Sequence, residues 1–302
     1  MTQSVLILGS NGRFGFHAAR AFAAAGWDVT CFDRKTGTLA EAVARKDVVV
    51  NAWNPSDYSK WARELLPMHQ QVLDAMAGSE TTLILPGNVY VFGEQTGEAW
   101  SANTPFRAVN DLGQMRINLE HAYRASGIRT IVLRGGDFLD TRASGNWFDK
   151  VMVAGLKRGA LTYLGREDIP HAWAFLPDIA RAAVMLSEMR QDLPIYADIP
   201  FPGYTLSARQ IAAYLEDITG RSVRIKQMSW NLLKVVGLVW PMVGALGKMR
   251  YLWNTPHMLD SRTFDALLPE FRSTPPQLAL RSAIQHLELP YLASAPLAEP
   301  AQ

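Results

Sequence analysis

Short continuous apolar runs alternate with helical segments in the first half of the chain. The runs predict strands buried on both faces of a sheet, at 5–8, 29–32, 48–50, 82–85 and 131–133. Helices are expected between them, in the Ala-rich segment that ends at Ala25 and at 57–77 and 111–125. This alternation predicts an α/β fold with a Rossmann-like doubly wound parallel sheet.

The second half of the chain has a different pattern. A helix is expected from Pro177 to Met189, because proline and acidic residues are favoured in a first turn. Short strands are expected at 194–198 and 223–227. These segments favour a smaller C-terminal α/β region beside the first sheet.

Two segments of this half have the spacing of a helix capping box. Ser207 lies three residues before Gln210, and Gly220 is placed to close the helix that follows. Thr274 lies three residues before Gln277 in the same way. Two further helices are therefore predicted.

Composition excludes several classes of protein. Charged residues are only 19% of the 302, and 30 basic against 28 acidic residues leave a net charge of +2. A balance so close to zero argues against a nucleic-acid partner bound by bulk charge. The six histidines are scattered and the single cysteine has no neighbour, so no metal site is expected. Cys31 falls in a predicted strand and is expected to be a small buried side chain.

No segment has the properties of a membrane span. The longest uncharged stretches, such as the one between Lys234 and Lys248, hold 13 residues, whereas a span needs about 20. The first residues also lack the pattern of a secretory signal. A cytoplasmic location is therefore expected.

Three glycines stand between the first predicted strand and the first helix. Gly9, Gly12 and Gly15 form a G-x-x-G-x-x-G turn. Such glycines permit a tight turn, the approach of the backbone to a pyrophosphate, and close packing of helix and sheet. The amides that open the helix then bind the anion. We expect a dinucleotide here, held by Gly9, Asn11, Gly12, Arg13, Phe14 and Gly15.

The second predicted strand ends near an acidic residue that bears on cofactor choice. Asp33 lies 18 residues beyond Gly15, where an acid binds the ribose 2′-hydroxyl of NAD. However, Arg34 and Lys35 follow at once, and Arg13 is expected near the adenosine end. Cations favour a 2′-phosphate. The sequence therefore slightly favours NADP, with NAD as the alternative.

Several motifs in order resemble the extended short-chain dehydrogenase/reductases, the NAD-dependent epimerase/dehydratase family. They are the glycine turn, DVVVNAW (47–53), GNVYVFG (87–93), LRGGDF (133–138) and HAWAFLPDIARA (171–182). The resemblance spans the chain from Val5 to about Ile284. It implies a cofactor loop at Asn51, Ala52 and Trp53, and a homodimer through the helices near 57–77 and 111–125.

The resemblance also implies a division of the chain. Residues 1–190 would form the NAD(P)-binding domain, with 140–167 contributing to the substrate cleft. Residues 191–292 would form a substrate domain, and 293–302 an Ala/Pro-rich disordered tail. Trp230–Trp253, rich in tryptophan, would belong to the substrate domain as core or as an apolar lining.

The catalytic residues of that family are absent at the matching positions. The family uses a Ser or Thr and a Tyr-x-x-x-Lys pair, and these positions hold Asn88, Leu112 and Arg116. Leucine cannot transfer a proton, and arginine stays protonated. Tyr90 lies two residues after Asn88, so both side chains face one way on an extended segment. We therefore expect Tyr90 to donate a proton, Asn88 to orient the substrate and Arg116 to anchor the cofactor.

Three functions remain open at this point. The first is an atypical NAD(P)-dependent oxidoreductase that transfers hydride to a small, rather apolar carbonyl or enone. The second is a non-catalytic NAD(P)-binding sensor, which the altered catalytic positions favour. The third is a sugar-nucleotide epimerase or dehydratase, which needs a base that the sequence does not reveal. The expected partner is a small molecule in each case.

Overall fold

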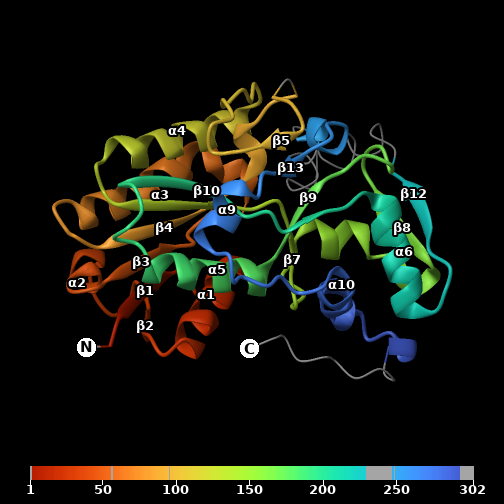
Figure 1. Ribbon diagram of the computed structural model, residues 1–302, viewed down its shortest axis with the longest axis horizontal. Coiled ribbons are helices and arrows are strands. Elements are labelled where there is room, and N and C mark those ends of the chain that lie inside the picture. The colour runs from red at the N-terminus through yellow and green to blue at the C-terminus, as the bar shows by residue number, and fades with distance from the viewer. Residues whose placement is uncertain (1, 56, 95, 229–246, 248, 293–302) are drawn as a thin grey trace.

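The protein is described by a computed structural model that covers residues 2–55, 57–94, 96–228, 247 and 249–292. Its centre is a parallel sheet of six strands in the order β2-β1-β3-β4-β6-β10 (Figure 1). Their bounds are β1 Ser4–Leu8, β2 Asp28–Cys31, β3 Val48–Asn51, β4 Thr82–Gly87, β6 Thr130–Arg134 and β10 Tyr196–Pro200. The predicted doubly wound sheet is confirmed.

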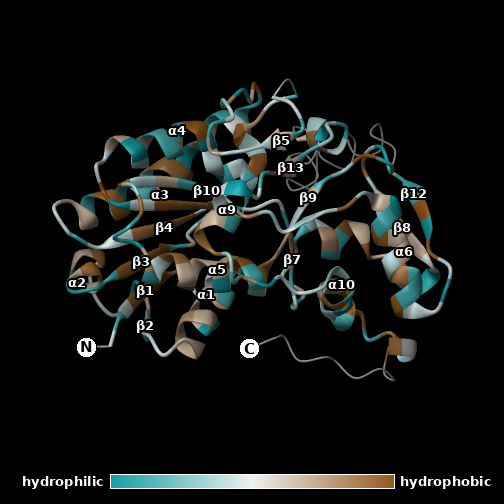
Figure 2. Cartoon of the chain, in the orientation of Figure 1, coloured by the Kyte–Doolittle hydropathy of each residue, from teal (hydrophilic) through white to brown (hydrophobic). Residues whose placement is uncertain are grey.

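Helices cover both faces of this sheet. One face packs on α1 (Arg13–Ala24) and α5 (Leu176–Glu188), and the other on α3 (Trp61–Met76) and α4 (Asp111–Ala125), with the short α2 (Leu39–Val43) beside α3. The strands at the centre of the sheet, such as β3 and β4, are mostly brown in the hydropathy view because their residues are mainly apolar and buried (Figure 2). The predicted helix at 111–125 has the observed bounds. Asn110 caps its first turn, and Gly127 follows its end with a positive φ.

Successive strands are added first on one side of β1 and then on the other. β2 pairs on one side of β1 and β3 on the other, so the loops after β1 and β3 diverge. Ligands of α/β proteins bind at such a switch point, beyond the carboxyl ends of the strands. The glycine turn begins at this point.

The edge position of β2 corrects one expectation. Cys31 is exposed rather than buried. β2 pairs with β1 alone, and its burial pattern shows no fully buried residue. An edge strand is covered on fewer sides than a central one, which the residue types alone do not reveal.

The second part of the molecule is built from small sheets and helices. β7 (Asp137–Leu139), β9 (Ala172–Phe175) and β11 (Tyr204–Thr205) form one sheet, while β8 (Ala160–Tyr163) pairs with β12 (Arg224–Gln227). α6 (Ala208–Thr219) and α10 (Pro276–Ile284) pack together beside them (Figure 1). β5 (Ala99–Trp100) pairs with β13 (Met258–Leu259), and α9 (Arg262–Leu267) contacts β10.

Single helical turns complete the described elements. They are η1 Tyr58–Lys60, η2 Val89–Val91, η3 Phe148–Met152, η4 Leu156–Arg158, η5 Arg250–Trp253, η6 Gln285–Leu287 and η7 Pro290–Leu292. η1 precedes α3 and η2 follows β4, and both lie at the site described below.

The two parts of the chain interleave. The boundary predicted at residue 190 falls before β10, which pairs with β6 and completes the central sheet. β7, β8 and β9 precede that boundary but lie in the small sheets, and of the three only β8 falls within 140–167. The chain leaves the sheet after β6, builds part of the second region and returns through α5. Most of Trp230–Trp253 and all of the expected tail lie outside the described residues.

Only one of the two predicted capping boxes forms. Ser207 and Gln210 make both reciprocal bonds, and Gly220 ends α6 with a positive φ. α10 instead starts at Pro276 without a side-chain cap. Both the amide and the hydroxyl of Thr274 donate to Asp178, in the first turn of α5. The second capping box was therefore wrong, because a buried carboxylate competes for the same threonine.

A buried cation joins the sheet to α4. Nη2 of Arg134, at the end of β6, lies 2.6 Å from carboxylate oxygens of Glu120 and Asp198. Its Nη1 donates to the carbonyl of Asn88 at 2.6 Å. Burial raises the pKa of Asp198, against the opposing charge of Arg134. This one side chain therefore fixes α4, β10 and the segment after β4, which carries Tyr90.

Replacing Arg134 by Met tests this anchor. The substitution leaves two buried carboxylates without their cation, so we expect the free energy of unfolding to fall by about 3–5 kcal/mol. Urea unfolding followed by tryptophan fluorescence measures it. Arg166→Met is the control, because Arg166 and Asp168 pair at the surface and should contribute little. Equal stabilities of the two variants would contradict the anchor.

Candidate active site

The glycine turn is closed by contacts that only glycine allows. Gly9 has a φ of +79°, and its carbonyl accepts the amide of Gly12 at 2.9 Å. A Cβ on Gly15 would lie 2.2 Å from the oxygen of Gly9. Helix α1 can therefore begin directly against the end of β1, and its N-terminus points into the switch point.

The start of α1 suits an anion. The first turn holds no acidic residue, and the first helical bond within α1 is made by Phe16, which donates to Gly12. The amides of Arg13, Phe14 and Gly15 are consequently left over, as in every helix N-terminus. A diphosphate group fits these donors and the helix dipole. The side chain of Phe14 is buried in the core, so only its amide can take part.

Arg13 does not point where the sequence suggested. Its guanidinium donates to the carbonyls of Ser144 and Gly145, at 3.3 and 3.0 Å, in the second part of the molecule. Its charge also lowers the pKa of Tyr58, against the larger effect of burial. The prediction that this side chain lies at the adenosine end is therefore wrong. Asn11 lies beside it in the turn and is exposed.

The expected adenosine end is lined by aromatic rings. The guanidinium carbon of Arg34 lies 4.5 Å from the ring centre of Trp53, and Phe32 packs on the same indole. Trp53 also approaches Gly9, where an added Cβ would lie 3.2 Å from its Cδ1. Asp33 is exposed and caps its own turn by accepting the amide of Lys35. Arg34 is thus stacked on Trp53, while the carboxylate of Asp33 stays accessible.

Asn51 and Ala52 have mainly supporting contacts. The Asn51 amide is buried, donates to the hydroxyl of Tyr123 at 2.8 Å and lies 3.1 Å from Nδ1 of His69. Burial lowers the pKa of His69 to about 3, so this network is uncharged. Ala52 donates its amide to Leu8. Asn51 therefore holds the loop that carries Trp53.

Two phenols meet beyond the end of β4. The hydroxyl of Tyr90, on η2, lies 3.2 Å from that of Tyr58, on η1. Burial raises the pKa of Tyr90 well above its usual range, and the nearby Asp137 adds to the shift. Burial raises the pKa of Tyr58 as well, but Arg13 and Arg116 oppose it. Both phenols are protonated at neutral pH, and Tyr58 is the one beside cations.

Asn88 and Arg116 lie with this pair. Oδ1 of Asn88 accepts the amide of Tyr90 at 3.0 Å, which leaves the Nδ2 group to donate. Arg116 is buried on α4 and donates through Nη2 to the carbonyl of Pro86. Its Nε has no hydrogen-bond partner. Leu112, one turn earlier, is packed into the core. The expected extended segment is wrong, because Asn88 caps the helical turn η2 that carries Tyr90. The roles of Tyr90, Asn88 and Arg116 remain predictions.

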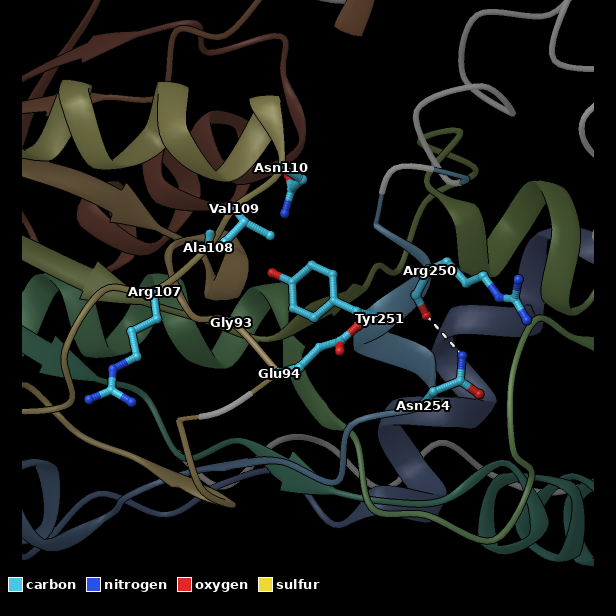
Figure 3. A pocket seen from close by; sticks show the side chains of 9 residues that line it. All are labelled: Gly93, Glu94, Arg107, Ala108, Val109, Asn110, Arg250, Tyr251 and Asn254. Carbon is cyan, nitrogen blue, oxygen red and sulfur yellow. Dashed lines mark hydrogen bonds between the residues drawn. The ribbon is translucent and has the colours of Figure 1, made fainter.

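A pocket of about 670 Å³ lies behind η2, next to the start of α4 (Figure 3). It is lined by Gly93, Glu94, Arg107, Ala108, Val109, Asn110, Arg250, Tyr251 and Asn254. The ring of Tyr251 projects between the segments before α4 and after η2. Its hydroxyl donates to the carbonyl of Phe92 at 2.6 Å and lies 3.3 Å from that of Tyr90. The pocket therefore adjoins the backbone that positions Tyr90.

Neither Tyr58 nor Asp137 was assigned a role from the sequence. Tyr58 belongs to no motif and is 32 residues from Tyr90, so only the fold pairs them. Asp137 lies beyond the end of β6 and bonds His171 at 2.8 Å. Its place after a strand of the parallel sheet was the one available signal. His171 itself is fully buried.

The described residues contain neither a candidate membrane-spanning helix nor a candidate metal-binding cluster. Within that part of the chain no helix is long and apolar enough to cross a membrane. The same part contains no cluster of three or more His, Cys, Asp or Glu side chains suited to a metal ion.

Comparison with known proteins gives a match in fold only. No model of a known protein family matches the sequence, and no curated protein does. UDP-glucuronic acid 4-epimerase from Bacillus cereus, solved with UDP-glucuronic acid and NAD, is 17% identical with a TM-score of 0.75. The match covers 96% of this chain and 100% of that one.

Two other solved structures agree. UDP-glucose 4-epimerase from Brucella ovis, solved with NAD, is 17% identical over 95% of this chain and 99% of its own, with a TM-score of 0.72. MoeE5, solved with UDP-glucose and NAD, is 14% identical over 94% and 98%, with a TM-score of 0.73. The fold implied by the resemblance is confirmed, because these structures share it over nearly the whole chain.

Gly15→Ala tests the turn. The added Cβ would meet the Gly9 carbonyl, so β1 and α1 must separate, and we expect dinucleotide affinity to fall at least tenfold. Titration of NADH fluorescence measures it. Gly37→Ala is the matched control, because its Cβ would meet only Glu41 at an ordinary 3.5 Å. Unchanged affinity in the Gly15 variant would show that the turn holds no dinucleotide.

Proposed function

We propose that this protein is an NAD-dependent oxidoreductase that reduces a carbonyl group of a small polar molecule. The pair of phenols at 3.2 Å, Tyr58 and Tyr90, carries this proposal, because it supplies a proton route where the usual tyrosine is replaced by Leu112. The fold adds support, since the similar structures named above were solved with NAD.

The groups at the adenosine end favour NAD over NADP. The expectation of NADP rested on Arg13, Arg34 and Lys35; the guanidinium of Arg13 is bonded to the carbonyl of Gly145, and that of Arg34 is stacked on Trp53. The exposed carboxylate of Asp33 would accept ribose hydroxyls and repel a 2′-phosphate. Trp53 offers a ring face on which adenine would stack.

Each residue of the site then has a distinct task. NADH, when bound, supplies the hydride. The amides of Arg13, Phe14 and Gly15 hold its diphosphate, and Arg116 offers its unpartnered Nε to ribose or phosphate oxygen. Asn88 donates through Nδ2 to the substrate oxygen, which polarises the carbonyl.

A relay of two phenols would provide the proton. As the carbonyl carbon gains hydride, its oxygen takes the proton of the Tyr90 hydroxyl. Tyr90 in turn takes the proton of Tyr58, and the negative charge comes to rest on Tyr58, near Arg13 and Arg116. The raised pKa of Tyr90 suits a donor better than a base, so reduction is favoured over initial oxidation.

A polar substrate fits this site better than the apolar enone expected from the sequence. That expectation depended on Trp230–Trp253, most of which lies outside the described residues; Leu252 and Trp253 are buried in the core, while Arg250 and Tyr251 line the pocket. The similar structures were solved with UDP-sugars, which are polar. A homodimer through α3 and α4 stays a prediction.

A non-catalytic dinucleotide sensor is the second candidate. The burial of Leu112 at the position of the usual tyrosine favours it. The oxidoreductase and the sensor are distinguished by whether NADH is oxidised. A sensor binds NADH without oxidising it in the presence of any hydroxyketone, aminoketone or sugar carbonyl offered.

Substituting the phenols tests the relay. Tyr90→Phe removes the proton donor, so we expect kcat to fall by about 10²–10⁴. Tyr58→Phe removes the group that returns a proton to Tyr90, so we expect kcat to fall by a smaller factor. NADH oxidation at saturating carbonyl substrate measures it. Tyr196→Phe is the control, because Tyr196 packs against Arg124 at the edge strand β10. A Tyr90 variant with the turnover of the control would remove the proposed role.

The pH dependence is a separate test. Because burial raises the pKa of Tyr90, the donor stays protonated as pH rises through 10, where an ordinary tyrosine ionises. We expect the reductive kcat to stay level from pH 7 to 10. A fall with a midpoint below about 9 would mean that another group donates the proton.

Asp33→Ala tests the cofactor preference. Removing the carboxylate should weaken NADH binding and relieve the repulsion of NADPH, so the ratio of the two dissociation constants should shift at least tenfold toward NADPH. Asp28→Ala, an exposed acid of the same edge strand, is the control. An equal shift in both variants, or none, would exclude a role for Asp33.

A further inference from the structure

Asp137 is a carboxylate at the edge of the site whose role remains to be assigned. It lies just beyond β6 and pairs with Trp173 through its backbone in the small sheet. Its side chain is 13% exposed, and Oδ2 lies 2.8 Å from Nε2 of His171. Among the described residues Oδ1 has no hydrogen-bond partner. Oδ2 is therefore held by His171, and Oδ1 is available to accept a hydrogen bond.

The geometry places this carboxylate opposite the phenols. β4 and β6 are neighbours, with Gly87 level with Arg134, so the segments that follow them emerge side by side. Burial is the main cause of the raised pKa of Tyr58, Tyr90 and Tyr163, and the charge of Asp137 adds to each. A substrate bound between the segments that follow β4 and β6 would therefore meet both Tyr90 and Asp137.

His171 fixes the orientation of Asp137. Its ring is fully buried among Trp147, Trp173 and His257. Its Nδ1 has no partner, so the ring is held on its polar side by the bond to Asp137 alone. An ionised carboxylate can only accept, so Nε2 carries the proton and donates. Burial lowers the pKa of the adjacent His257 well below its usual range, so that ring brings no positive charge.

Resting on the proposed function, we propose that Asp137, oriented by His171, selects the substrate by accepting a hydrogen bond from a hydroxyl or ammonium group near the reacting carbonyl. The substrate class is thus a small hydroxy- or amino-carbonyl compound. The carboxylate would repel the phosphates of a phosphorylated ketone or of a nucleoside diphosphate bound beside it, so such compounds are expected to bind weakly.

The distribution of cations agrees with this substrate class. Of the two cations that act on Tyr58, Arg13 is bonded to the carbonyls of Ser144 and Gly145, and Arg116 is the one assigned to the cofactor. Two more acids, Asp140 and Asp149, flank the segment that Arg13 contacts. Arg107 and Arg250 line the pocket of Figure 3, beyond Tyr251 and the η2 backbone, and both have other partners. Among the described residues, the cations named here are thus bonded to other protein groups or assigned to the cofactor.

Four matched ketones test the selection: butanone, hydroxyacetone, aminoacetone and dihydroxyacetone phosphate, with UDP-glucose as a fifth probe. Binding to the NADH-saturated protein is measured by saturation-transfer NMR, and turnover by NADH oxidation. We expect hydroxyacetone and aminoacetone to exceed butanone at least tenfold in affinity, and the two phosphate compounds to bind more weakly than butanone. Phosphate compounds that bind best, or no binding by any probe, would overturn the proposal.

Variants separate this proposal from the proposed function. Asp137→Asn should lower the affinity for aminoacetone about 10- to 100-fold and raise that for dihydroxyacetone phosphate, with NADH affinity unchanged. Asp265→Asn, an exposed acid on α9, is the control. An unchanged ratio of the two probes in Asp137→Asn would overturn the role of Asp137, whatever the turnover. Failure of NADH oxidation together with the expected binding ratios would contradict only the oxidoreductase function.

His171→Gln tests the positioning role. The bond to Asp137 is weakened, so KM for hydroxyacetone should rise about tenfold while kcat and NADH affinity change little. A fall in kcat at constant KM would show that His171 acts otherwise. Melting temperatures of both variants report whether the fold persists.

Discussion

The contact between the carbonyl of Gly9 and the backbone of Gly15 determines where everything else in this molecule lies. It brings α1 against the end of β1, so the free amides of the helix face the switch point between β1 and β3. Trp53, which follows β3, lies next to the same turn. The side chain of Arg13, which is part of the turn, donates a hydrogen bond to the second part of the chain. A bulkier side chain at residue 15 would therefore disturb the expected cofactor site and the connection between the two parts.

The altered catalytic positions are consistent with one another. Leu112 fills the core where a tyrosine would reach the substrate, and Arg116 turns to the backbone of β4. The phenols that remain come from η1 and η2, on the other wall, and Asp137 faces them from β7. In the proposed function the proton donor and the substrate-recognition group thus come from other elements, on a fold shared with a solved sugar-nucleotide epimerase.

Local patterns predicted much of this fold and less of the site. The glycine spacing located the turn, and Asn110 and Gly127 bounded α4, because turns and caps depend on a few neighbouring residues. Cys31 and Thr274 were misjudged, since exposure at a sheet edge and competition from Asp178 depend on distant parts of the chain. The same limit explains Tyr58, Arg13 and the Asp137–His171 pair, whose partners are between 32 and 132 residues away.

A crystal structure of the complex with NADH and a hydroxyketone tests the central claim most directly. The account predicts diphosphate oxygens within hydrogen-bond distance of the amides of Arg13, Phe14 and Gly15. It also predicts the ketone oxygen on the hydroxyl of Tyr90, with the nicotinamide ring beside it. A dinucleotide bound away from the glycine turn, or a nicotinamide ring out of reach of Tyr90, would contradict it.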